Sequence, residues 1–105
     1  MDEFSVSRRR SGDAIVVAPA GEIDLATIDI VEASIQAAIA ETDTLVLDLR
    51  DVSFIDSAGV RLVLETSRDV PHFSVVRGPR EVQRVFDLVG LDDRLTILDE
   101  PPGAA

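Results

Sequence analysis

A four-residue segment, Asp56-Ser57-Ala58-Gly59, carries the side chains of this chain that are best suited to chemistry. An apolar run of strand length precedes it and a run with helical spacing follows, so we expect Ser57 to be a helix N-cap. A helix N-terminus presents free backbone N–H groups and the positive end of a dipole. These groups would bind a phosphoryl group on the Ser57 hydroxyl, which would add about 1.5 to 2 negative charges beside Asp56. The segment predicts a serine switch, with helix capping as the alternative role of Ser57.

Gly59 lies in the expected first turn of that helix, although glycine costs about 1 kcal/mol there relative to alanine. Its missing side chain lets another backbone or a phosphate approach closely. The alternative is structural, because a glycine also eases a tight entry into a helix.

A hydrolytic site is the main catalytic alternative, because Ser57 and the single histidine, His72, could join a carboxylate in a Ser-His-Asp triad. The residue two positions before Ser57 is Ile55, so the Gly-x-Ser-x-Gly elbow of serine hydrolases is missing. The sequence has no nucleotide-binding glycine motif, and without cysteine it has no thiolate metal site. We expect His72 to be a solvated loop residue and the chain to be a binding protein rather than an enzyme, with no cofactor and no metal.

The chain is strongly acidic, since 20 acidic and 10 basic residues among 105 give a formal net charge of −10. Such a surface repels nucleic acid and anionic membranes and suits a partner with a basic face, unless the acidity serves solubility alone. No apolar run approaches the roughly 20 residues of a membrane span, and the N-terminus has no apolar signal core. We therefore expect one cytoplasmic domain that binds neither nucleic acid nor membrane.

Strand and helix patterns alternate along most of the chain. Two strands around the turn residues 11–13 indicate an antiparallel hairpin, and Pro19 and Gly21 are expected to end its second strand. The alternation that follows requires right-handed crossovers and a mostly parallel sheet. The expected fold is α/β, a single domain with a mixed, mostly parallel sheet, an N-terminal β-hairpin and three to four packed helices. The expected strands are 4–10, 14–18, 44–49, 73–76 and 95–98, and the expected helices are 27–40 (with Thr27 as N-cap), 58–68 and 80–89.

Three segments of the sequence, in the same order, resemble segments of STAS domains, the family of anti-sigma factor antagonists. They are "GEIDLATI" at 21–28, "LDLRDVSFIDSAGVRLVLE" at 47–65 and "VQRVFDLVGLDDRLTI" at 82–97. The Asp-Ser-x-Gly core of the family matches Asp56, Ser57 and Gly59. The resemblance covers nearly the whole chain, so we expect a STAS domain over residues 1–99 and a flexible C-terminal tail over 100–105.

This resemblance implies a bacterial, cytoplasmic regulator of transcription. Its unphosphorylated form is expected to bind an anti-sigma factor that is also a GHKL-type serine kinase, and thereby to release a sigma factor. Phosphorylation of Ser57 by that kinase would switch binding off, and a serine phosphatase would restore it. The residues implied at the partner surface are Asp24, Asp56, Ser57, Ala58, Gly59, Val60 and Arg61.

Several alternatives stay open at this point. Asp24 could instead cap the following helix, and Asp56 either orients Ser57 or shapes the loop. Ala58 stands where many members carry Ser or Thr, and Arg61 stands where many carry a small residue, which would change the choice of kinase without removing the acceptor. A second interpretation is a non-catalytic STAS scaffold, as in stressosomes or in lipid-transport or anion-transport systems, which need not be phosphorylated.

Overall fold

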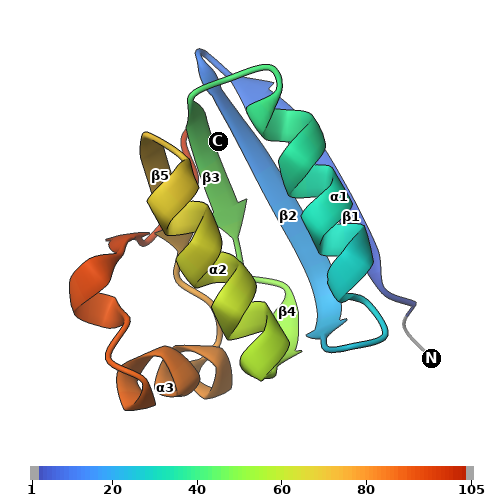
Figure 1. Cartoon of the computed structure of the whole chain (residues 1–105), viewed down its shortest axis with the longest axis vertical. Coiled ribbons are helices and arrows are strands. Elements are labelled where there is room, and N and C mark those ends of the chain that lie inside the picture. The colour runs from blue at the N-terminus through green and yellow to red at the C-terminus, as the bar shows by residue number, and fades with distance from the viewer. Residues whose placement is uncertain (1–2, 104–105) are drawn as a thin grey trace.

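A six-stranded mixed sheet with helices packed against it forms the framework of the computed structural model, which describes residues 3–103 (Figure 1). β1 pairs antiparallel with β2, and every other pairing among the described residues is parallel. The order across the sheet is β1-β2-β3-β5-β6, with β4 also on β2. This confirms the predicted α/β fold with its N-terminal hairpin. The strands are β1 (Ser5–Ser11), β2 (Ala14–Ile23), β3 (Thr44–Asp48), β4 (Val52–Ile55), β5 (His72–Val76) and β6 (Thr96–Leu98), and the helices are α1 (Ile28–Ile39), α2 (Ser57–Asp69), α3 (Arg80–Leu88) and a 3-10 helix (Asp92–Arg94).

β2 is longer than predicted, because Pro19 and Gly21 lie inside it rather than ending it. Its first half pairs with β3 through residues 14–17, and its second half pairs with β4 through residues 21–23. The Gly21 N–H donates to Asp51 O at 3.0 Å, on the β4 side. N–H groups alternate sides along a strand, so the nitrogen of Pro19, two residues before Gly21, faces the same side as the Gly21 N–H. At the level of Pro19, β3 has ended and β4 has not begun. Proline is tolerated there, since no partner needs its missing N–H.

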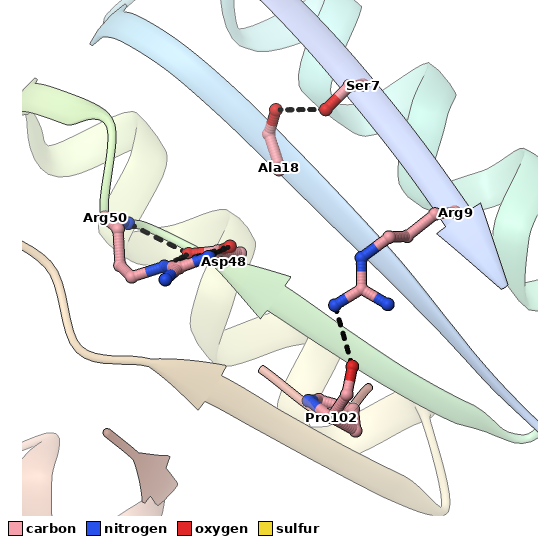
Figure 2. A network of polar contacts seen from close by, with 6 residues as sticks. All are labelled: Ser7, Arg9, Ala18, Asp48, Arg50 and Pro102. Carbon is pink, nitrogen blue, oxygen red and sulfur yellow. Dashed lines mark hydrogen bonds and ion pairs between the residues drawn. The ribbon is translucent and has the colours of Figure 1, made fainter. Parts of the chain in front are cut away.

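The sequence pattern does not predict β4, whose four residues follow β3 after a short turn. Asp48 and Arg50 shape that turn. The buried Asp48 carboxylate accepts the Arg50 backbone N–H at 3.1 Å and the Arg50 guanidinium at 3.0–3.3 Å (Figure 2). The hydrogen bond and the charge of Asp48 raise the pKa of the Arg50 guanidinium. The turn sets β4 beside the second half of β2, so that β4 continues where β3 stops.

The main core lies between the helices and one face of the sheet. α1 packs on β1, β2 and β3, α2 packs on β4 and β5, and α3 lies against β4 (Figure 1). Val31 and Ile35 of α1 are fully buried, as their helical spacing predicts. α3 ends at Leu88, and the predicted glycine follows it as the left-handed C′ residue, since Gly90 has φ 73° and the Leu91 N–H donates to Phe86 O at 3.0 Å.

The other face of the sheet carries a smaller apolar cluster, and the C-terminal segment crosses it. The cluster consists of Ala14, Val16, Val46 and Val76, with Leu98 beside them. Arg9 lies opposite residue 16 in the register, and its Nη2 donates to Pro102 O at 2.7 Å (Figure 2). Pro101 is buried. The predicted domain limit at residue 99 stays a prediction, and residues 104 and 105 of the predicted tail lie outside the described residues.

Candidate functional site

Asp56, and not Ser57, is the N-cap of α2, so the predicted capping role of Ser57 is wrong. Asp56 has an extended backbone, and its Oδ1 accepts the N–H groups of Ala58 at 3.0 Å and Gly59 at 3.2 Å. The Asp56 N–H donates to Ile23 O at 3.1 Å. This bond holds residue 56 extended against the end of β2, and α2 begins at Ser57, one residue before the predicted start at residue 58. Of the two roles left open for Asp56, the geometry supports shaping of the segment.

This cap occupies the N–H groups that were expected to bind a phosphate. The N–H groups of Ala58 and Gly59 already donate to the Asp56 carboxylate. The Val60 N–H donates to Asp56 O at 3.0 Å and so begins the helical pattern. The expectation that free N–H groups of this turn would bond a phosphate on Ser57 is therefore wrong for residues 58 and 59.

Packing requires the glycine at position 59. A Cβ atom added to Gly59 would lie 2.5 Å from Ile55 Cγ1 and 2.9 Å from Ile23 Cγ2. Ile23 and Ile55 are register partners in β2 and β4, so the first turn of α2 lies directly over this pair. Gly59 is buried, and of its two predicted roles the geometry supports the close entry of a helix rather than the approach of a phosphate.

The structure brings the Asp24 segment and the Asp56 segment together. The residues before them, at positions 23 and 55, pair in register, so the chain leaves β2 and β4 at the same edge of the sheet. Asp24 Oδ1 accepts the Ala26 N–H at 2.9 Å, and Thr27 Oγ1 accepts the Asp24 N–H at 3.0 Å. Asp24 therefore shapes the loop before α1 instead of capping that helix. Thr27 occupies the predicted N-cap position but makes no side-chain cap bond.

A groove of about 340 Å³ lies between α1 and α2 and contains Ser57. Its lining residues are Leu25, Ile28, Glu32, Ser57, Ala58, Arg61, Leu62 and Glu65. Ser57 is exposed, and the side chain of Leu25 is 80% exposed. The groove therefore places an exposed apolar side chain beside a hydroxyl and charged groups, a composition compatible with a protein-binding surface that has an apolar centre and a polar rim.

Only some of the residues predicted at the partner surface line this groove. Ser57, Ala58 and Arg61 line it. Val60, in contrast, is half-buried and packs against the core. Sequence reasoning placed Asp24 of the loop before α1 at the partner surface but missed Leu25 of the same loop, as well as Ile28 and Glu32 of α1. One signal was available for Leu25, a large apolar residue between an acidic residue and small ones in the predicted loop.

His72 lies at the opposite end of α2 from Ser57. It is exposed, and it is the first residue of β5 rather than a loop residue. The 13 residues of α2 separate the two positions by about 20 Å, so the geometry does not support a triad. Among residues 3–103, no helix has both the length and the apolar character needed to cross a bilayer.

Comparison with known proteins gives consistent matches over most of the chain. Residues 5–101 match the STAS domain. The chain is 33% identical over 95 residues to the anti-sigma-F factor antagonist RsfB of Mycobacterium tuberculosis, which covers 87% of this chain and 78% of RsfB. The crystal structure of an anti-sigma factor antagonist from Mycobacterium paratuberculosis matches with a TM-score of 0.86 and 27% identity, over 93% of this chain and 87% of that one. The unphosphorylated form of the anti-sigma factor antagonist SpoIIAA matches with a TM-score of 0.74 and 25% identity, over 93% and 90% of the two chains. The resemblance carried by the three sequence segments is confirmed, and the chain belongs to the STAS domain family.

Proposed function

We propose that this chain is an anti-sigma factor antagonist that acts by binding and not by catalysis. Similarity to proteins of that name, over most of the chain, supports the proposal. The observation that carries it is the groove between α1 and α2, where the exposed Ser57 shares one surface with the exposed Leu25. In this proposal the unphosphorylated groove binds an anti-sigma factor of the GHKL serine-kinase type, and a sigma factor is released.

Phosphorylation of Ser57 then switches the binding off. The exposed Ser57 hydroxyl makes no hydrogen bond within residues 3–103, so a kinase can modify it without breaking a contact of the fold. A phosphate adds about 1.5 to 2 negative charges to a groove that already holds Glu32 and Glu65. A partner that fits the neutral serine would have to desolvate and bury that charge, which is costly. A serine phosphatase restores the binding form.

The acceptor is tested by calorimetry with the GHKL-type anti-sigma kinases encoded in the same genome. Ser57→Ala is expected to bind one of them about as tightly as the unmodified chain, and Ser57→Asp at least tenfold more weakly. Ser53, an exposed serine on β4 outside the groove, supplies the control: Ser53→Asp adds the same charge and is expected to leave affinity unchanged. Kinase and ATP should modify residue 57 in mass spectra. Tight binding by Ser57→Asp, together with an unmodified Ser57, would refute the switch.

The surface is tested by two leucines with nearly equal exposure. Leu25 in the groove is 80% exposed, and Leu88 at the end of α3 is 79% exposed. Burying a leucine at an interface contributes about 1.5–3 kcal/mol, so Leu25→Ser is expected to weaken binding about tenfold or more. Leu88→Ser should leave the affinity unchanged, and neither substitution should lower the melting temperature. Equal loss of affinity in both variants would remove the groove from the proposal.

A further inference from the structure

Arg61 lies one helical turn after Ser57 on α2. Residues four apart on a helix project from the same face, with about 5–6 Å between their Cβ atoms. Both side chains are exposed, and both line the groove between α1 and α2. Arg61 takes no part in the ion pairs found among residues 3–103. The arginines that form those pairs are Arg8, Arg10, Arg50 and Arg77.

The charged groups around Arg61 come from both helices. Glu65 follows it by one turn on α2, and Glu32 faces the groove from α1. Asp56 precedes Ser57, but its Oδ1 is already engaged by the N–H groups of residues 58 and 59. Among the residues that line the groove, Arg61 supplies the single positive charge against two carboxylates.

A phosphate on Ser57 therefore meets one nearby cation and few free backbone donors. The N–H groups of Ala58 and Gly59 are used by the cap, so they cannot bind it without releasing Asp56. Arginine presents a planar set of donors that matches the oxygens of a phosphate, and the resulting charge-assisted bonds are roughly twice as strong as neutral ones.

We infer that Arg61 is the positioning residue for phosphorylated Ser57: its guanidinium binds the phosphate within the same chain and holds it over the groove. This inference rests on the proposed phosphorylation of Ser57. In the unphosphorylated chain the guanidinium stays in the field of Glu32 and Glu65. After modification it turns toward residue 57, and the phosphate covers the surface that Leu25 shares with the serine. Arg61 thus fixes the phosphate in one position over the groove. Without this contact the phosphate would rotate freely as a dianion.

The test measures the second ionisation of the phosphate itself. Phosphoserine is placed at position 57 of the full chain during translation, so no kinase is needed, and its phosphorus NMR signal is followed with pH. A cation in contact with the phosphate favours the dianion, so the pKa in the unaltered background should lie about half a unit or more below that in Arg61→Gln. Arg61→Lys keeps the charge without the planar fork and should fall between the two.

Arg68 provides the matched control. It lies on the same helix and is also exposed, but it is 11 residues from Ser57, or about 16 Å along the axis. This exceeds the Debye length of about 10 Å at 0.1 M salt, so Arg68→Gln should leave the phosphate pKa unchanged. The same pKa in Arg61→Gln as in the unaltered background, or an equal change in Arg68→Gln, would overturn the inference.

The two proposals fail separately. If phosphoserine at position 57 shows the Arg61-dependent pKa but does not weaken anti-sigma binding, the proposed switch is wrong and the Arg61 contact stands. If phosphoserine weakens binding but its pKa does not respond to Arg61→Gln, the switch stands and the role of Arg61 is wrong.

Discussion

Because Asp56 and not Ser57 caps α2, these two adjacent residues should contribute differently to the stability of the fold. Replacing Asp56 by alanine leaves the N–H groups of Ala58 and Gly59 without their acceptor. Loss of an N-cap side chain costs about 0.5–2 kcal/mol, typically about 1. Ser57→Ala removes a hydroxyl that makes no hydrogen bond within the described residues, and alanine is the better helix former by a few tenths of a kcal/mol.

The two substitutions are compared by thermal unfolding of the full chain followed by circular dichroism at neutral pH. For a domain of this size, about 1 kcal/mol corresponds to roughly 4–8 °C in melting temperature. Asp56→Ala is expected to melt lower by that amount, and Ser57→Ala to melt within about 2 °C of the unaltered chain. Asp56→Asn is the matched control, because asparagine caps as well as aspartate and differs in charge.

The outcome decides between a cap and an electrostatic effect. A low melting temperature for Asp56→Ala with a normal one for Asp56→Asn assigns the loss to the two N–H bonds. A loss in Ser57→Ala as large as that in Asp56→Ala would refute the cap assignment. It would also mean that Ser57→Ala cannot serve as a clean deletion of the phosphate acceptor.

Two further outcomes are expected from the contacts around the fold. Gly59→Ala places a Cβ against Ile55, and the resulting overpacking should cost about 1–3 kcal/mol, more than the gain of about 1 kcal/mol in helix propensity. Denaturant unfolding should therefore show a less stable variant, and a more stable one would contradict this expectation. Glu41 accepts a bond from Arg8 at 2.7 Å, and this bond and the charge of Arg8 lower the pKa of Glu41 below its ordinary 4.5. Because the folded-state pKa is lowered, the stabilisation is present above pH 4.5 and is lost as the pH falls through the lower value. The difference in melting temperature between Glu41→Gln and the unaltered chain should therefore shrink in acid, and a constant difference would contradict the pair.

Local patterns predicted the helices well because each helix carries its own signals. The ends of α1, α2 and α3 agree with the sequence within one residue. The errors in the sheet have a different origin. Pro19 and Gly21 are strand breakers in isolation, and they are tolerated in β2 because its neighbour changes from β3 to β4 at that point. The same change produces β4, which exists because the extended β2 offers it a partner.

The one-residue error at the start of α2 also comes from tertiary structure. Aspartate and serine are equally good N-caps, so the sequence alone does not choose between Asp56 and Ser57. The bond from the Asp56 N–H to Ile23 O decides, because it keeps residue 56 extended beside the sheet. The groove could be predicted only in part for the same reason, since Leu25 and Glu32 belong to a segment about thirty residues earlier in the sequence.

The residues of the Asp56–Gly59 segment have different roles in the structure. Asp56 caps the helix, and Gly59 lets the first turn pack on Ile23 and Ile55. Ser57 does neither and remains exposed in the groove. A charge placed on it therefore changes the surface while the cap and the packing beneath stay as they are. This arrangement suits the proposed reversible modification of Ser57, because a partner can distinguish the two forms without the domain unfolding in either.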